Sequence, residues 1–493
     1  MLKTVFLSGL LSLFTCSAVF AADAPVVLPI PVTAPPQPAE LTLIRQQHTT
    51  GLPDEIREWM QQNAIPEANL SAYIRDLNAN GPLLAHNDSV PRNPASTMKL
   101  VTTWAALKLL GPAYTWKTES WLRGELKDGV LTGDLILKGY GDPFLTDEAF
   151  REMLHDLQLK GLKEIRGNLV VDNSYFNLPP QDPAAFDGEP SKVYNAPPSA
   201  LMYNFQAVRF LLEPDALNKR VKVTPFPTIP GLQVDNQLKL SVGGCNKAHY
   251  KPGVRREGNV VKLVGSYATG CGQNFILRVL SSPEENVFHA FRDVWHSQGG
   301  IFNGQLQTGA VQQDDVRFHT HESRTLGEQI RFVNKWSNNV MARHLFLTTG
   351  ARSGGEPATL EKARVAMSGV LEQAGINLDG MVVENGSGLS RQERISTRQL
   401  GQLLEAAWRD PYMPEFMASM PLLGEDGTLA QRFDGTELRG RSHMKTGTLK
   451  DSSAIAGYML TRSGKRLVIA LVHNGSEAGH GLQDALLKWA FEQ

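Results

Sequence analysis

The chain has 493 residues, of which 42% are hydrophobic and 20% are charged, with 49 lysines and arginines against 50 aspartates and glutamates. At roughly 150 residues per domain, this length allows about three domains and a large buried core. The composition excludes a disordered chain, a collagen and a disulfide-dense miniprotein. A net charge of −1 provides no field that would hold a polyanion, so nucleic acid is not an expected partner.

The first residues of the chain have the pattern of a secretory signal. Lys3 precedes an apolar run that ends at Phe20, and small residues follow it. This run of about 16 residues is shorter than the roughly 20 that a membrane-spanning helix needs. We therefore predict a signal peptide over residues 1–21 and an exported protein, with the periplasm as its expected compartment. A retained anchor and a lipoprotein modified at Cys16 are the weaker alternatives.

Export changes what the cysteines indicate. Cys16 leaves with the signal, so Cys245 and Cys271 remain in an oxidising compartment, each beside glycines. This arrangement predicts one disulfide that closes a loop, and two free buried thiols are the alternative. Further ligands are too few nearby for a metal site, so none is expected. Residues 22–45 are rich in proline and predict an extended tether between the signal and the folded chain.

The predicted elements begin with two strands, Asn69–Leu77 and Pro82–His86. A helix over Thr97–Leu110 follows, preceded by a proline and stopped by Gly111, which is the usual punctuation of a helix. This placement puts Ser96 at the first turn of the helix.

From about residue 119 to residue 320 the chain consists of short β-rich runs separated by glycine and proline, for example Gly129–Lys138, Gly167–Val171, Val221–Val223 and Val260–Val264. Helical patterns then return, and the chain ends with two strands and a helix. These later elements are the helices Leu326–Phe346, Thr359–Ala374 and Thr397–Ala407, the strands Ala454–Leu460 and Arg466–Val472, and the helix Leu482–Phe491.

This order of elements predicts an insertion inside a domain whose halves lie at the two ends of the chain. We expect residues 46–115 and 320–493 to form a sheet covered by helices. Residues 116–319 are then a β-rich insertion, with a nested subdomain around residues 205–285. The apolar stripe of the last helix, which includes Trp489, favours packing on the sheet, so at most a loose membrane association is expected.

Three short motifs carry the chemistry, and the first is Ser96-Thr97-Met98-Lys99. A serine hydroxyl is a poor nucleophile until a base removes its proton. Residues i and i+3 share a helix face, so Lys99 can reach the Ser96 hydroxyl, and burial beside another cation can lower the pKa of a lysine enough for it to act as a base. Ser442-His443-Met444-Lys445 has the same spacing, so the tetrad alone is a weak signal.

The second motif, Ser337-Asn338-Asn339, lies within a helical pattern. The Ser337 hydroxyl can pass a proton to a leaving amine, and Asn339 can hold a substrate amide. Taken alone, the motif is better explained as a helix-capping pair.

The third motif, Lys445-Thr446-Gly447, precedes two strands of a predicted hairpin. A glycine on an edge strand lets a substrate backbone approach closely and pair with it, and Lys445 and Thr446 would then meet a carboxylate. The alternative is an exposed edge strand with a solvated lysine.

The order of the three motifs is more specific than any one of them, because it is the signature of penicillin-recognising acyl-serine enzymes. It also selects Ser96 over Ser442 as the nucleophile. The sequence resembles the class C penicillin-binding proteins, that is, the D-alanyl-D-alanine carboxypeptidase/endopeptidase family of the penicillin-binding protein 4 type (peptidase family S13). The segments that carry this resemblance are Asn93–Lys99, Gly139–Pro143, Asn195–Ala200, Ser337–Asn339, Gly386–Arg391 and Lys445–Gly447.

The resemblance implies an α/β, multi-domain fold with a transpeptidase/β-lactamase-like catalytic domain and a large insertion. It implies acyl transfer from a peptidoglycan stem peptide to Ser96, with the backbone N–H groups of Ser96 and Thr448 as the oxyanion hole. Lys445 and Thr446 would bind the terminal carboxylate and Asn339 the acylated peptide. No metal or organic cofactor is required, and β-lactams should acylate Ser96 as substrate mimics.

The chain departs from the family's usual residues at two positions, with Asn338 and Asn385 where aspartate is usual. The acidic residue that holds the side-chain amine of the stem peptide in some members has only Asp187 or Glu189 as candidates here. An exported serine β-lactamase and a non-catalytic wall-binding scaffold are the alternative functions. The small β-lactamases lack room for the 241 residues between Ser96 and Ser337, and a scaffold would have decayed motifs.

Overall fold

A computed structural model describes residues 51–246, 250–476 and 479–493. The predicted signal peptide and tether, residues 1–45, lie outside the described residues. Within the described ranges, no helix combines the length and the apolar character that crossing a bilayer requires.

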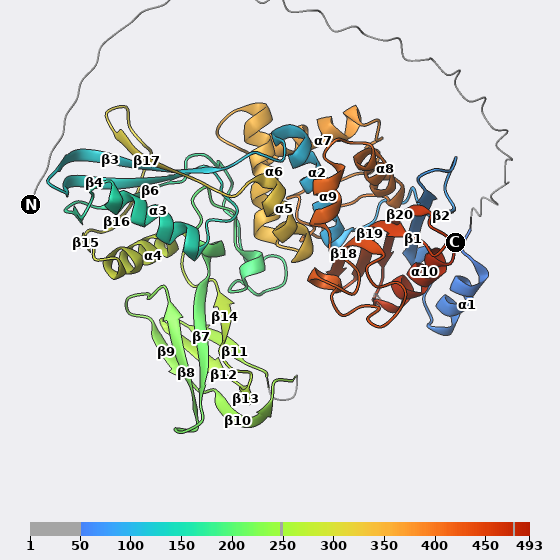
Figure 1. Cartoon of the computed structure of the whole chain (residues 1–493), viewed down its shortest axis with the longest axis horizontal. Coiled ribbons are helices and arrows are strands. Elements are labelled where there is room, and N and C mark those ends of the chain that lie inside the picture. Colours follow the sequence, from blue (N-terminus) through green and yellow to red (C-terminus); the bar gives the residue numbers. More distant parts are fainter. Residues whose placement is uncertain (1–50, 247–249, 477–478) are drawn as a thin grey trace, which may run out of the picture. The chain divides into compact units, whose positions relative to one another are not determined.

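One half of the fold is built on a five-stranded antiparallel sheet with the order β18-β19-β20-β1-β2. Strands from the two ends of the chain meet in it, because β1 pairs with β20 along its whole length, with Tyr73 opposite Ala470 (Figure 1). This confirms the two predicted strands at each end of the chain. The strands are β1 (Leu70–Asp76), β2 (Leu84–His86), β18 (Ser442–Leu449), β19 (Ser452–Leu460) and β20 (Arg466–Asn474).

Alternate residues of these strands face two different helical layers, as a pleated sheet requires. Ala456 and Tyr458 belong to the core shared with the larger layer, whereas Ile455 and Met459 belong to the core shared with the first and last helices. The larger layer contains α2 (Met98–Leu110), α5 (Leu326–Lys335), α6 (Asn339–Gly354), α7 (Leu360–Gln373), α8 (Thr397–Trp408) and α9 (Met413–Ser419). The other layer contains α1 (Asp54–Gln62) and α10 (Gly481–Phe491).

Helix α2 is the central helix of the larger layer. It is buried on all sides, from Met98 to Leu107, and it packs against α5, α6 and α7. A helix that is apolar all round belongs in a core. The burial of α2 therefore places the lysine in its first turn, Lys99, in the protein interior.

The predicted single helix over Leu326–Phe346 is wrong, because the structure divides it into α5 and α6 at Trp336–Asn338. Ser337 has φ 57°, a left-handed backbone conformation that no continuous helix contains. The Asn338 side chain then accepts a hydrogen bond from the Met341 N–H at 3.1 Å and begins α6. The apolar periodicity continues across the break, which explains why the pattern did not reveal it.

The insertion contains a larger sheet in which β15, β5, β4, β3 and β17 are neighbours, with β6 and β16 paired beside them. Its strands are β3 (Lys117–Lys127), β4 (Val130–Gly139), β5 (Glu164–Ile165), β6 (Leu169–Asp172), β15 (Ile301–Phe302), β16 (Leu306–Thr308) and β17 (Val316–Glu322). The insertion was expected to be β-rich, and it also contains two helices that the pattern did not reveal, α3 (Asp147–Leu159) and α4 (Pro283–Ser297), which cover this sheet. Each helix begins at a hydroxyl N-cap, Thr146 and Ser282 respectively.

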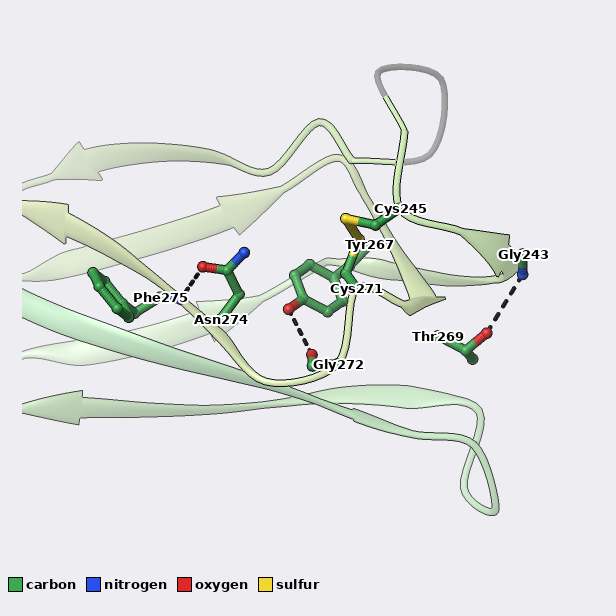
Figure 2. Close-up of a disulfide and its surroundings, with 8 residues drawn as sticks. All are labelled: Gly243, Cys245, Tyr267, Thr269, Cys271, Gly272, Asn274 and Phe275. Carbon is green, nitrogen blue, oxygen red and sulfur yellow. Dashed lines mark hydrogen bonds between the residues drawn. A yellow bond between two sulfur atoms is a disulfide. The ribbon is translucent and has the colours of Figure 1, made fainter. Parts of the chain in front are cut away.

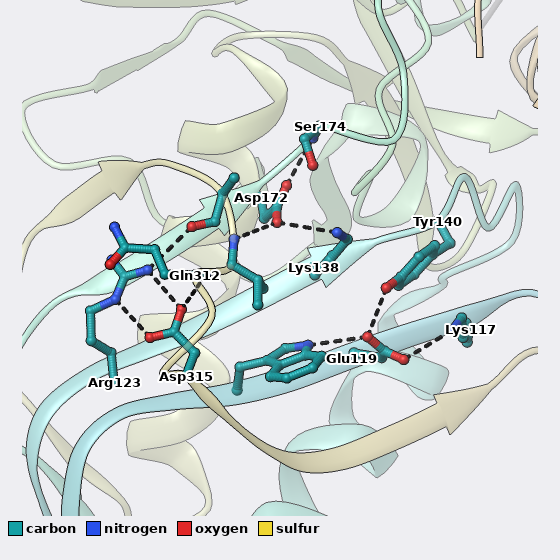
Figure 3. A network of polar contacts seen from close by, with 12 residues as sticks. Lys117, Glu119, Arg123, Lys138, Tyr140, Asp172, Ser174, Gln312 and Asp315 are labelled. Atoms are coloured by element: carbon teal, nitrogen blue, oxygen red, sulfur yellow. Dashed lines mark hydrogen bonds and ion pairs between the residues drawn. The ribbon is translucent and has the colours of Figure 1, made fainter. Parts of the chain in front are cut away.

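Buried carboxylates tie together the strands of this sheet (Figure 3). Glu119 on β3 accepts hydrogen bonds from Tyr140 at 2.8 Å and from Lys117 and Trp121 at 3.1 Å. Arg123, further along β3, makes a two-pronged ion pair with Asp315, which lies just before β17. Since charged groups rarely lie inside a fold without partners, these pairs fix how β3, β4 and β17 align.

Residues 208–278 form small sheets around a core of their own, which includes Phe210, Val261, Leu263 and Tyr267. The structure joins Cys245 and Cys271 in a disulfide with Cα atoms 4.6 Å apart (Figure 2). The strands here are β7 (Val208–Asp215), β8 (Arg220–Phe226), β9 (Gln233–Asn236), β10 (Lys239–Gly244), β11 (Gly253–Glu257), β12 (Val260–Val264), β13 (Ser266–Gly270) and β14 (Asn274–Arg278). Short 3-10 turns elsewhere are Glu67–Asn69, Ala95–Thr97, Val193–Asn195, Asn204–Gln206 and Gly427–Leu429.

Candidate active site

Ser96 lies in a 3-10 turn, Ala95–Thr97, that leads directly into α2. The turn is held by Asn93, whose side chain accepts from the Ala95 N–H at 2.9 Å and donates to the Ser390 carbonyl at 2.8 Å. Ala95 has φ 45°, an unfavourable conformation for a residue with a Cβ. Such local strain persists only where the surroundings fix it, and it is common at functional sites.

Lys99 follows one helical turn later and is completely buried. Its Nζ lies 2.9 Å from the Ser96 Oγ and 2.6 Å from the Asn339 Oδ1, and it also donates to the Ser387 carbonyl. Burial, reinforced by the nearby Lys445 ammonium, holds the pKa of Lys99 well below that of an ordinary lysine. A neutral amine in hydrogen-bond contact with a serine hydroxyl has the geometry of a general base.

Lys445 is the second buried lysine, and it comes from β18 on the opposite side of the site. Its Nζ donates to the Ser337 Oγ at 2.9 Å and to the Thr446 carbonyl at 2.6 Å. Burial lowers the pKa of Lys445 to about 7. The left-handed conformation of Ser337 thus brings its hydroxyl to the site, while the next residue caps α6 and Asn339 faces Lys99. Both interpretations of this motif therefore apply: Asn338 is the helix cap, and its neighbours Ser337 and Asn339 contact the two lysines.

Strand β18 is an edge strand that passes directly beside the nucleophile. A Cβ atom on Gly447 would lie 2.7 Å from the Pro94 carbonyl oxygen and 2.8 Å from the Ser96 nitrogen, so only glycine permits this approach. Thr446 is half-buried and Thr448 is exposed on the same strand. The strand therefore offers two hydroxyl groups and a close backbone next to Ser96.

The outer edge of β18 is only partly covered. Leu422 forms an isolated bridge with His443, and the Met444 N–H donates to the Pro421 carbonyl at 2.9 Å. In the described part of the chain, this backbone pairing ends at Met444. An extended peptide can pair with the edge beyond that point, as in strand addition.

A cavity of about 450 Å³ lies beside the site. It is lined by the segment 179–197 of the insertion, by Arg343 one turn after Asn339, and by the loop 384–392. Its volume and its mixed polar and apolar lining are those of a small-molecule site.

The carboxylates that line this cavity differ from the two acidic candidates of the sequence. The Asp187 carboxylate is occupied by the Tyr194 hydroxyl and the Asn195 amide, each at 2.8 Å, and Glu189 is exposed outside the lining. The carboxylates in the lining are those of Asp182 and Glu384. Sequence proximity to the Asn195 motif suggested Asp187 or Glu189, and the Asp187 carboxylate also holds that motif in place.

The competing tetrad, Ser442 to Lys445, does not form a catalytic pair. Both residues lie on β18, where positions i and i+3 point to opposite faces. Ser442 is completely buried, and the Lys445 amine is bonded to Ser337 instead. Geometry thus agrees with the choice of Ser96.

Sequence reasoning missed three residues of the site. The Ser387 carbonyl accepts from Lys99, the Glu393 carboxylate supports the loop that carries Ser387, and the Thr428 Oγ1 lies 2.8 Å from the Thr446 Oγ1. A backbone acceptor leaves no trace in a sequence pattern, and neither glutamate nor threonine stands out in a loop. Asn385 accepts from the Ser387 N–H and hydroxyl, so it shapes the same loop.

The described site therefore contains a nucleophile with a base, a second hydroxyl with a cation, and an open strand edge. This combination can carry out acyl transfer to a serine and can bind a carboxylate beside it.

Comparisons with known proteins agree with this chemistry. The chain is 28% identical to a D-alanyl-D-alanine carboxypeptidase of Actinomadura sp. (strain R39) over 462 residues, which is 89% of this chain and 84% of that protein. It is 26% identical to the D-alanyl-D-alanine carboxypeptidase DacB of Haemophilus influenzae over 424 residues, 84% of this chain and 87% of that protein. The crystal structure of penicillin binding protein 4 from Haemophilus influenzae has the same fold, with a TM-score of 0.73 at 23% identity, covering 89% of this chain and 99% of that one.

These matches confirm the expected α/β fold of a penicillin-recognising serine enzyme. Residues 52–493, nearly all of the described chain, match one family, and the protein belongs to it: the D-Ala-D-Ala carboxypeptidase 3 (S13) family.

Proposed function

We propose that this protein is a serine D,D-peptidase that removes D-alanine from, or cuts cross-links between, peptidoglycan stem peptides through an acyl-Ser96 intermediate. The observation that carries this proposal is the triangle of hydrogen bonds from Lys99 to Ser96, Asn339 and Ser387. The Lys99 amine removes the proton from the Ser96 hydroxyl, and the freed Oγ attacks the carbonyl carbon of the penultimate D-alanine.

The negative charge that develops on the carbonyl oxygen meets the N–H groups of Ser96 and Thr448. Loss of one such donor typically costs about 10²–10³ in rate. When the C–N bond breaks, the proton that Lys99 took from Ser96 passes to the leaving amine by way of the Ser337 hydroxyl, so that Lys99 is neutral again and Lys445 keeps its charge. Water then hydrolyses the ester and restores Ser96.

Substrate recognition follows from the same strand edge. Lys445 and Thr446 bind the terminal carboxylate, and Asn339 binds the acylated peptide through its side-chain amide. The 450 Å³ cavity receives the remainder of the stem peptide, where Arg343 and Glu384 provide one charge of each sign.

The other parts of the chain have supporting roles in this proposal. Residues 1–21 direct export to the periplasm and residues 22–45 form a tether. Residues 46–115 and 320–493 make up the catalytic domain, and residues 116–319 are its insertion.

A β-lactam should acylate the same serine. The penicillin binding protein 4 of Haemophilus influenzae has been crystallised with a β-lactam, and its fold is that of this chain. A β-lactamase would release the opened drug quickly, whereas a peptidase keeps the adduct.

The test is release of D-alanine from a synthetic pentapeptide that ends in D-Ala-D-Ala. We expect Ser96→Ala to abolish release and Lys99→Ala to reduce it by at least 10³-fold. Ser442→Ala is the matched control, because it removes the serine of the other tetrad, and it should retain activity. Equal loss in Ser96→Ala and Ser442→Ala, or release that survives in Ser96→Ala, would contradict the assignment.

A further inference from the structure

The loop 384–388 brings a backbone carbonyl to the catalytic lysine. Two successive carbonyls of this loop face α2, since that of Gly386 accepts from the Thr102 hydroxyl at 2.6 Å and that of Ser387 accepts from the Lys99 amine. The loop also packs against the nucleophile's turn, because a Cβ on Gly388 would lie 1.9 Å from the Ala95 carbonyl oxygen. A shift of this loop would therefore move the acceptor of Lys99.

One carboxylate oxygen holds the loop in this position. The Glu393 Oε1 accepts from the N–H groups of Gly386 at 2.9 Å, Asn385 at 3.0 Å and Glu384 at 3.3 Å. Three backbone donors on one oxygen are typical of an ionised carboxylate. The backbone on the C-terminal side of Glu393 is also held in place. Ile395 forms a backbone bridge with Arg92, and Ser396 caps α8.

Glu393 also interacts electrostatically with two buried cationic residues, Lys99 and Arg343. It is completely buried, and its Oε2 has no hydrogen-bond partner within the described residues. The charged groups around it are Lys99 on α2, Arg343 on α6 and the carboxylate of Glu384. Burial raises the pKa of Glu393, while the three N–H groups oppose this and favour its charged form.

We propose that Glu393 is a positioning residue for acylation, which places the Ser387 carbonyl against Lys99 and supplies the negative charge that offsets the cations around that lysine. This role rests on the proposed function of Ser96 and Lys99. Glu393 touches neither the substrate nor the reacting atoms, and it acts through the loop and through its electrostatic field.

The charge and the hydrogen bonds can be tested separately. Glu393→Gln keeps an oxygen that accepts from the loop but removes the charge. Glu393→Ala removes both. The measurement is the second-order rate of acylation by a chromogenic β-lactam as a function of pH, in the full-length mature protein.

We expect Glu393→Gln to move the acidic limb of the profile to lower pH by about one unit. Loss of the nearby anion destabilises the protonated form of Lys99, so its pKa falls and the free amine persists at lower pH. We expect Glu393→Ala to lower the plateau rate by about 10- to 100-fold, because the loop is no longer held.

Glu405→Gln is the matched control, because Glu405 is another buried carboxylate, bonded to Tyr73 and Arg75 in a different region. It should alter the melting temperature without moving the acidic limb. The proposal is overturned if the pH profile of Glu393→Gln coincides with that of the wild type. This comparison is sufficient by itself, so the test remains valid if Glu393→Ala does not fold. Failure of the wild type itself to acylate would instead refute the function assigned to Ser96.

Discussion

Two buried lysines lie on either side of the Ser96 hydroxyl, and burial lowers the pKa of both. The pKa of Lys99 is lowered by burial and by the adjacent Lys445, so this amine is suited to act as a base. Lys445 has a pKa of about 7 and contacts Ser337, so it can remain charged and attract a carboxylate. Pairs of titratable groups with distinct pKa values are the usual means of running acid and base steps at one pH.

This difference predicts a bell-shaped dependence of kcat/KM on pH for a peptide that ends in a free carboxylate. Activity rises as Lys99 loses its proton and falls as the pH increases through about 7, where Lys445 loses its charge. The control substrate has an amide in place of the terminal carboxylate. If the alkaline limb is equally steep for both substrates, Lys445 does not recognise the carboxylate.

Asn338 predicts a separable effect on stability. Because its side chain caps α6 and does not contact Lys99, Asn338→Asp should leave acylation within about two-fold and should stabilise the helix slightly through the helix dipole. Asn338→Ala should cost about 1 kcal/mol in the free energy of unfolding. Thermal melts and acylation rates of both variants would test this, and a ten-fold loss of acylation in Asn338→Asp would show that the residue acts in catalysis.

At this scale the sequence predicted most of the residues that the structure brings together around Ser96, but not the residues that support them. Ser96 and Lys99 could be paired from helical spacing, and the order of the motifs added Ser337 and Lys445. Glu393 and Thr428 could not be found, because their role arises from loops that meet only in the folded chain. Asp187 stays a prediction, and its oxygens also accept from Tyr194 and Asn195.

At the scale of elements, the site depends on the close approach of β18 to the turn that carries Ser96. Gly447 is the residue that permits it, and the contact is between backbone atoms that have little freedom to move. The same strand carries Lys445 and Thr446, so a small displacement would affect both the proposed oxyanion hole and the proposed binding of a carboxylate.

We therefore expect Gly447→Ala to reduce acylation by at least 10²-fold while the protein stays folded, because the added methyl group pushes the N–H groups of Ser96 and Thr448 apart. Gly464→Ala is the control, because Gly464 lies in an open hairpin turn of the same sheet with nothing near its Cβ position. It has φ 88°, so a modest loss of stability is expected there. Unimpaired acylation in Gly447→Ala would contradict the assigned oxyanion hole.

Strands and helices with a clear periodicity of apolar residues were predicted well. Elements without such a pattern were missed. The terminal strands and α10 lie where alternation and apolar spacing placed them. Helices α3 and α4 were missed because short β-rich runs surround them. The break at Ser337 was missed because a helical pattern runs across it, although the helix-capping interpretation of Ser337-Asn338-Asn339 pointed to a helix start there.

At the scale of the whole molecule, the disulfide stabilises a part of the insertion whose core is separate from that of the active site. Cys245 and Cys271 close a loop with a sequence separation of 26 residues. In the chain-entropy description, a loop of this length stabilises the folded state by about 3.5 kcal/mol. None of the site residues belongs to the core around the disulfide.

Replacing both cysteines by serine should therefore lower the melting temperature of the insertion while acylation of Ser96 remains unchanged. Calorimetry and the acylation rate, measured on the same samples, would test this. A parallel loss of acylation would show that this part of the insertion supports the catalytic domain. Thiol titration of the unreduced, unfolded mature protein, from which Cys16 has been removed with the predicted signal, should find no free thiol.

The central claim is that Ser96 forms a long-lived acyl-enzyme. The most direct measurement is the intact mass of the mature protein during incubation with benzylpenicillin, with Ser96→Ala beside it. We predict a single adduct of the mass of the drug that persists in the wild type and is absent from the variant. An adduct that forms equally in Ser96→Ala, or a transient one with rapid hydrolysis of the drug, would contradict the account.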